Sequence, residues 1–201
     1  GTKLIWILLY NIFMRHIEKA CNMLQESNNY KHILEFGVYE GKTISIIKNT
    51  VSSDYKIYGF DSFEGLPEDW KSDAGLIAGD GRCVKGCFSL NGNIPIIEGL
   101  ELYKGWFNDT LPEYLKIAEP ISLLHVDCDL YSSTKTVLYG LNDYIKEGSI
   151  IVFDEWFYNH NPMDNDHEQK CFYEWVKDYN REFELISYND DCEQKIVKIL
   201  K

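Results

Sequence analysis

Positive charge is scarce in this 201-residue chain, which has 20 lysine and arginine residues against 32 aspartate and glutamate residues and a formal net charge of -12. Proteins that bind nucleic acids use positive charge to displace the counterions of the phosphates, so this balance argues against a nucleic-acid partner. It also disfavours binding to anionic membrane surfaces. A small neutral or cationic ligand, or a metal ion, fits the charge better.

Long hydrophobic runs are missing as well. The most apolar stretch, Leu4–Met14, is shorter than the roughly 20 residues that a membrane-spanning helix needs. One lysine precedes it and no clear cleavage site follows, so the pattern does not indicate a signal peptide. We expect Lys3–Glu26 to form an amphipathic helix whose apolar side covers the domain or pairs with a second copy in a homodimer.

The six cysteines contain no Cys-x-x-Cys pair. Only Cys83 and Cys87 lie close together, and a zinc site would need two more ligands that the nearby sequence does not supply. We therefore expect reduced, mostly structural thiols and a cytoplasmic protein.

Short apolar runs alternate with helical patterns along most of the chain, which predicts an α/β fold with parallel βαβ units. No repeat or linker divides it, so we expect a helical segment over residues 1–30 and one domain over residues 31–201. Residues 65–93 and 156–167 are polar, and we expect them to form loops that lie over a ligand-binding site. The predicted strands are His32–Phe36, Lys56–Phe60, Ile94–Ile97, Ile121–Val126, Ser149–Phe153, Phe183–Ser187 and Gln194–Leu200. The predicted helices are Lys42–Asn49, Leu111–Lys116, Ser133–Lys146, which is expected to stop at Gly148, and Glu168–Asn180.

The first two predicted strands end in residues that indicate an adenosine-type ligand. Glu35–Thr43 contains two glycines that permit a tight turn before a helix, although an ordinary strand-to-helix turn has the same composition. Its carboxylates would repel the phosphates of a dinucleotide but suit the cationic S-adenosylmethionine. Asp61, followed by Ser62, ends the second strand, where a carboxylate can accept hydrogen bonds from ribose hydroxyls.

Acidic residues also follow two later strands that we expect to be neighbours: Asp127 and Asp129 after one, Asp154 and Glu155 after the other. Carboxylates crowded at one rim repel each other, and a divalent cation such as Mg²⁺ resolves the repulsion. We therefore predict that a divalent cation binds among these carboxylates. The alternative is that Asp127 and Asp154 only cap the helices that follow.

A general base could assist deprotonation of a hydroxyl group bound beside such a metal ion. Asp129 is our first choice by position, with His160 and His167 of the following loop as further candidates. A histidine in such a loop is more often an ordinary surface residue. His125 lies inside a predicted strand, and we interpret it as a core histidine with a hydrogen-bond partner.

The string from Glu35 to Thr43 resembles the first motif of class I S-adenosylmethionine-dependent methyltransferases. Three further segments, Gly59–Pro67, Lys104–Pro112 and Asp127–Thr134, are similar to the macrocin O-methyltransferase family, which methylates sugar hydroxyls. The resemblance covers about residues 32–155. It implies a Rossmann-like fold: a mostly parallel seven-stranded sheet with an antiparallel last strand and helices on both faces.

The resemblance also implies roles for individual residues. Glu35, Gly37 and Tyr39, with Gly41 in the same motif, would line the methionine end of the cofactor. Thr43 would hold the cofactor carboxylate, Asp61 the ribose, and Gly105 and Trp106 would lie near the adenine, although Trp106 is equally well explained as a structural residue. Asp127 would contribute to cofactor binding, and Asp127, Asp154 and Glu155 would hold the metal ion. Glu155 stands where the family usually has an aspartate.

We therefore expect a metal-assisted O-methyltransferase acting on a sugar or glycosylated small molecule. Three alternatives remain open from the sequence: an N-methyltransferase without a metal, a nicotinamide-dependent oxidoreductase, and a non-catalytic ligand-binding module.

Overall fold

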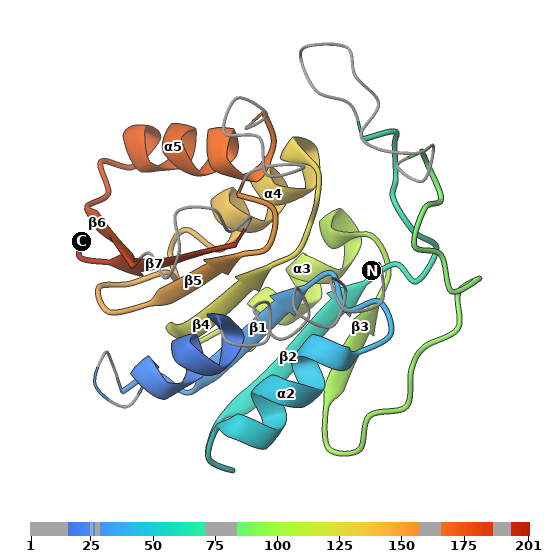
Figure 1. The fold of residues 1–201 in the computed structure, drawn as a ribbon, viewed down its shortest axis with the longest axis horizontal. Coiled ribbons are helices and arrows are strands. Elements are labelled where there is room, and N and C mark those ends of the chain that lie inside the picture. Colours follow the sequence, from blue (N-terminus) through green and yellow to red (C-terminus); the bar gives the residue numbers. More distant parts are fainter. Residues whose placement is uncertain (1–15, 25, 27–28, 71–83, 157–165, 187–193) are drawn as a thin grey trace, which may run out of the picture.

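The computed structural model describes residues 16–24, 26, 29–70, 84–156, 166–186 and 194–201. It contains a seven-stranded sheet in the order β3-β2-β1-β4-β5-β7-β6, in which β7 runs opposite to the other six strands (Figure 1). The strands are β1 (His32–Phe36), β2 (Lys56–Asp61), β3 (Glu101–Lys104), β4 (Ile121–Val126), β5 (Ile150–Phe153), β6 (Phe183–Ile186) and β7 (Lys195–Ile199). The predicted fold class, with its antiparallel last strand, is confirmed.

Helices cover both faces of this sheet because successive side chains of the central strands point to opposite sides. On one face, Leu34 and Val126 pack in a cluster with residues of α3 (Phe107–Leu115), α4 (Tyr131–Gly140) and α5 (Glu168–Asp178). On the other, Ile33 and Leu123 pack against α2 (Lys42–Thr50) and the helix of residues 16–24. Figure 1 shows these two helices, in blue and in light blue to cyan, on the same side of the sheet.

The described part of the predicted N-terminal helix covers the sheet. Ile17, Ala20 and Leu24 lie on its buried side at positions three and four apart, the spacing of an amphipathic helix. Residues 1–15 lie outside the described residues, so homodimer formation through this segment stays a prediction. Within the described residues, no helix is both long and apolar enough to cross a membrane.

Three predicted elements were wrong in position. The third strand is Glu101–Lys104 at the sheet edge and not Ile94–Ile97, where Ile96 is fully exposed. The helix predicted from Leu111 begins four residues earlier, at Phe107, and continues through Pro112. The helix predicted to stop at Gly148 ends at Gly140; Gly148 instead stands in the turn before β5, with its N–H 2.8 Å from the carbonyl of Ile199.

Candidate active site

A cavity of about 720 Å³ opens at the carboxyl ends of β1, β2, β4 and β5. The strand order reverses between β1 and β4, and open parallel sheets bind ligands at such a reversal. Nine of the predicted site residues line this cavity: Gly37, Tyr39, Asp61, Ser62, Trp106, Asp127, Asp129, Asp154 and Glu155. The chain order of the strands thus brings together residues that are more than a hundred positions apart.

The turn after β1 requires its first glycine. Gly37 has a φ of +96°, and a Cβ atom at this position would lie 1.8 Å from the backbone oxygen of Asp127. The Gly37 N–H donates to the carbonyl of Phe60 at 2.9 Å, so the backbone crosses between β2 and β4 with no room for a side chain. Tyr39, also at positive φ, presents a 41% exposed side chain to the cavity.

Asp61 at the end of β2 fixes that turn. Its Oδ2 accepts the backbone N–H groups of Val38 and Tyr39 at 2.9 and 2.7 Å, and its Oδ1 accepts the N–H of Phe63 at 2.7 Å. A carboxylate oxygen has two lone pairs, so Oδ1 keeps capacity for one ligand hydroxyl. The predicted contact of Asp61 with a ribose therefore stays compatible with this geometry. The ribose contact itself stays a prediction.

Four of the predicted cofactor residues do not line the cavity in the described structure: Glu35, Gly41, Thr43 and Gly105. Gly41 begins α2 at a φ of +80°, and Thr43 is buried within that helix. The Gly105 N–H donates to the backbone oxygen of Asp61 at 2.9 Å. Gly41 is thus explained by its backbone conformation, and Thr43 by packing within the fold.

Ser62 and Trp106 flank the cavity. The Ser62 hydroxyl donates to the carbonyl of Gly65 at 3.2 Å and accepts the N–H of Glu64 at 3.0 Å, which closes the turn after β2. Trp106 caps α3, lines the cavity and is 40% exposed. A tryptophan used only for packing would be expected to lie deeper, so its exposed ring is available for stacking on a ligand.

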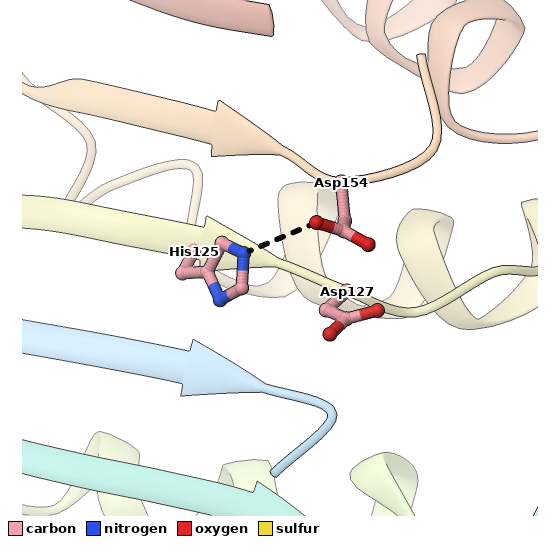
Figure 2. Close-up of side chains that lie close together, drawn as sticks. All are labelled: His125, Asp127 and Asp154. Carbon is pink, nitrogen blue, oxygen red and sulfur yellow. Dashed lines mark ion pairs between the residues drawn. The ribbon is translucent and has the colours of Figure 1, made fainter. Parts of the chain in front are cut away.

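Three side chains converge at the rim where β4 and β5 end (Figure 2): His125, Asp127 and Asp154 offer ligand atoms that all lie within 4.8 Å of one another. His125 Nδ1 lies 3.1 Å from Oε2 of the fully buried Glu35, its register partner on β1. Its Nε2 is buried, has no hydrogen-bond partner among the described residues, and lies 4.0 Å from Oδ1 of Asp154. His125 is thus buried, as expected, yet only one of its nitrogens is satisfied.

Burial and repulsion between neighbouring carboxylates raise the pKa values of carboxyl groups at this rim. Burial, followed by the charges of Asp154 and Asp129, raises the pKa of Asp127 well above its usual value. Burial, followed by Asp154 and Asp61, raises the pKa of Asp129 to about 8. Burial raises the pKa of Glu35 too, although its hydrogen bond with His125 opposes that shift. A cation at the rim would relieve these repulsions.

The donor set fits a divalent metal ion. Two carboxylates and an unpartnered imidazole nitrogen suit Mn²⁺, Zn²⁺ or Fe²⁺ better than they suit Mg²⁺, which prefers oxygen ligands. The hydrogen bond from Nδ1 to Glu35 is the arrangement in which histidine presents Nε2 to a metal. Glu155, which we predicted as the third ligand, lines the cavity but does not belong to this group of three.

The candidate bases have different positions. Asp129 is 9% exposed, lines the cavity and adopts a φ of +60°. His160 lies outside the described residues. His167 accepts the backbone N–H of Tyr131 at its Nδ1, 3.1 Å away, and so fastens the start of α5 to the start of α4.

Glu168 is a site residue that the sequence did not reveal. It is fully buried in the first turn of α5 and accepts backbone N–H groups from the ends of both β4 and β5. From the sequence it reads as an acidic residue at a helix N-terminus, where such residues are common. Its contacts depend on where α5 is placed, and no local pattern encodes that placement.

A sheet of this topology, with a glycine turn after β1, a carboxylate at the end of β2 and an acidic cavity between them, defines the class I S-adenosylmethionine-dependent methyltransferases. Residues 34–156 match the model of a family described as a methyltransferase domain. The chain belongs to this family and is an S-adenosylmethionine-dependent methyltransferase. No protein of curated function matches the sequence at a significant level.

Solved structures with the same fold are related only distantly in sequence. CalS11, a calicheamicin methyltransferase that is also described as a TDP-rhamnose 3′-O-methyltransferase, is 21% identical with a TM-score of 0.71, over 96% of this chain and 79% of that one. The O-methyltransferase NovP is 20% identical with a TM-score of 0.70, over 94% and 79%. An O-methyltransferase from Bacillus cereus in complex with SAH is 16% identical with a TM-score of 0.59, over 93% and 81%. At these identities the likeness shows the fold.

Proposed function

We propose that this methyltransferase transfers the methyl group of S-adenosylmethionine to a hydroxyl group of a sugar or glycosylated small molecule, assisted by a divalent cation. The observation that carries the proposal is the convergence of Asp127, Asp154 and the unpartnered His125 Nε2 on the rim of the cavity that Asp61 and Gly37 also line. An oxygen acceptor needs help in losing its proton, whereas an amine acceptor does not need a metal.

The charge of the cavity supports the cofactor. Among the described residues, six carboxylates line the cavity, against one lysine, Lys85. The six are Asp61, Glu68, Asp127, Asp129, Asp154 and Glu155. Such a wall attracts the sulfonium and ammonium of S-adenosylmethionine and repels the phosphates of a dinucleotide. This balance, together with the family assignment, leaves the nicotinamide-dependent alternative without support.

The reaction is a direct displacement. The acceptor oxygen attacks the S-methyl carbon, the carbon–sulfur bond breaks, and S-adenosylhomocysteine leaves. The proton of the acceptor hydroxyl passes to a carboxylate, for which we propose Asp129 at the cavity wall. A divalent cation held by His125, Asp127 and Asp154 would lower the pKa of a hydroxyl bound beside it. The residues that line the cavity would hold the two reactants next to each other.

The acceptor class is inferred from the cavity and the structural neighbours together. About 720 Å³ is more than the cofactor alone requires, and exposed aromatic side chains of Tyr39, Phe88 and Trp106 line the cavity. Aromatic faces commonly pack against the apolar side of sugar rings. CalS11, which has this fold, acts on a rhamnose carried by TDP.

The test is formation of S-adenosylhomocysteine from S-adenosylmethionine with a panel of sugars and glycosides, and with amines of similar size, each with and without added Mg²⁺ or Mn²⁺. We expect turnover of hydroxylated acceptors that falls at least tenfold after chelation. Asp154→Asn should abolish the metal dependence, and Asp143→Asn, in an exposed turn, should not. Turnover of amines that is indifferent to chelation would identify an N-methyltransferase instead.

A further inference from the structure

Glu168 joins the ends of two neighbouring strands across the candidate active site. Its Oε1 accepts the backbone N–H groups of Cys128 and Asp129 at 3.0 and 3.2 Å, and its Oε2 accepts the N–H of Glu155 at 3.1 Å. The first two amides follow β4 and the third follows β5. One carboxylate therefore holds the segments that carry the acidic residues of the rim.

These amides need such a partner because the chain leaves the sheet ladder at this point. Asp129 has a φ of +60°, a conformation that is uncommon for residues other than glycine, and the N–H of Leu130 turns back to the carbonyl of Cys128 at 2.6 Å. A buried N–H without an acceptor is costly. By accepting the N–H groups of Cys128 and Asp129 together, Glu168 stabilises the turn that directs the Asp129 side chain to the cavity.

The position of Glu168 is unfavourable for stability alone. Its side chain is fully buried, and the nearby charges of Asp154 and Asp129 act against its ionised form. A neutral glutamine of the same size would avoid this repulsion but has only one oxygen. Its amino group would face one of the donors, so no uncharged residue of similar shape can accept three N–H groups on two oxygens. A carboxylate is therefore required to accept all three N–H groups, even though burying its charge near Asp154 and Asp129 is unfavourable.

Glu168 does not line the cavity, so it is distinct from the residues that contact ligands there. Both of its oxygens already accept backbone N–H groups. Because Glu168 does not line the cavity, it acts on a ligand there through the backbone that it holds.

We propose that Glu168 is a positioning residue that fixes the separation of the β4 and β5 ends, so that Asp127 and Asp154 act together as one cation site with Asp129 directed to the acceptor. The proposal rests on the proposed function and extends it to a residue outside the cavity. The proposal also implies that the start of α5, where Glu168 follows His167, supports the rim where β4 and β5 end.

The experiment compares the wild-type 201-residue chain with Glu168→Gln and with Glu174→Gln. Glu174 is a matched control because it lies on the same helix and accepts one hydrogen bond, from the hydroxyl of Tyr131. Three quantities are measured for each: affinity for S-adenosylhomocysteine by calorimetry, affinity for Mn²⁺ by electron paramagnetic resonance, and hydrogen exchange of individual backbone amides by NMR.

We expect Glu168→Gln to weaken Mn²⁺ binding at least tenfold and to accelerate exchange at Cys128, Asp129 and Glu155. Affinity for S-adenosylhomocysteine should stay within threefold, because the Gly37 turn and Asp61 are untouched, and this also shows that the variant is folded. Glu174→Gln should match the wild type. If Glu168→Gln does not fold, Glu168→Met, which has similar length and places no donor against the Glu155 amide, takes its place.

Mn²⁺ affinity in Glu168→Gln equal to that of the wild type would overturn the proposal. Wild-type protein that binds S-adenosylhomocysteine but not Mn²⁺ would instead contradict the cation in the proposed function. In that case the positioning role is decided by the amide exchange rates of Glu168→Gln, compared with those of the wild type at an unchanged melting temperature. Faster exchange confined to the three amides supports it, and unchanged exchange refutes it.

Discussion

Replacing Asp61 tests how the end of β2 prepares the cofactor site. In Asp61→Ala, the N–H groups of Val38, Tyr39 and Phe63 lose their common acceptor. The first two belong to the turn that follows β1, so this turn loses its fixed conformation. Asp61→Asn keeps one oxygen for two of the donors but presents an amino group to the remaining one.

The magnitude follows from the number of bonds. A hydrogen bond to a charged group contributes about 1.5–3 kcal/mol, so loss of the two bonds to the turn corresponds to about 3 kcal/mol or more. Because each 1.4 kcal/mol changes an equilibrium constant about tenfold, affinity for S-adenosylhomocysteine should fall about 100-fold in Asp61→Ala. Asp61→Asn, which can keep both bonds to the turn, should lose roughly tenfold.

Calorimetric titration with S-adenosylhomocysteine measures these affinities, and circular dichroism checks that each variant is folded. Asp109→Asn is the control, since Asp109 is an exposed carboxylate in the first turn of α3 that does not line the cavity. Binding by folded Asp61→Ala within threefold of the wild type would refute the reasoning, because the carboxylate would then be dispensable to the turn.

Two further predictions concern stability. Gly37→Ala should destabilise the protein by about 3 kcal/mol in urea unfolding, because its Cβ would meet the backbone of Asp127. Gly86→Ala is the control: Gly86 has a φ of +84° and no atom within 4 Å of an added Cβ, so this variant should lose only about 1 kcal/mol. Equal losses of stability in the two variants would contradict the steric argument. Burial lowers the pKa of His32 from 6.5, so the unfolded chain binds the proton more readily and stability falls as the pH drops below about 6.5. His32→Gln should remove this part of the pH dependence when unfolding is compared at pH 5 and 7.5, and an unchanged difference between the two pH values would count against it.

Local patterns predicted the buried strands well. β1 and β4 are mostly apolar, fully buried strands, and both were predicted with their observed bounds because a strand buried on both faces has a strong local apolar signal. The edge strand β3 was missed. Its residues are only half-buried or exposed, so Glu101–Lys104 lacks the apolar signal that misleadingly marked Ile94–Ile97.

The sequence by itself determined the order of the elements and the residues at the strand ends. Because parallel strands end at one edge of a sheet, the positions of Gly37, Asp61, Asp127 and Asp154 were enough to place them in one site. Residue type also indicated a cationic cofactor, since charge repulsion does not depend on detailed packing.

Only the tertiary structure decided which side chains meet. The register of β1 against β4 pairs His125 with Glu35, and its second imidazole nitrogen faces Asp154. His125, and not the predicted Glu155, therefore joins Asp127 and Asp154 in the group of three. The packing of α5 over the strand ends brings Glu168 to amides 13 to 40 residues away. Such contacts depend on strand register and helix docking, which are set by the whole core and are not encoded in any short segment.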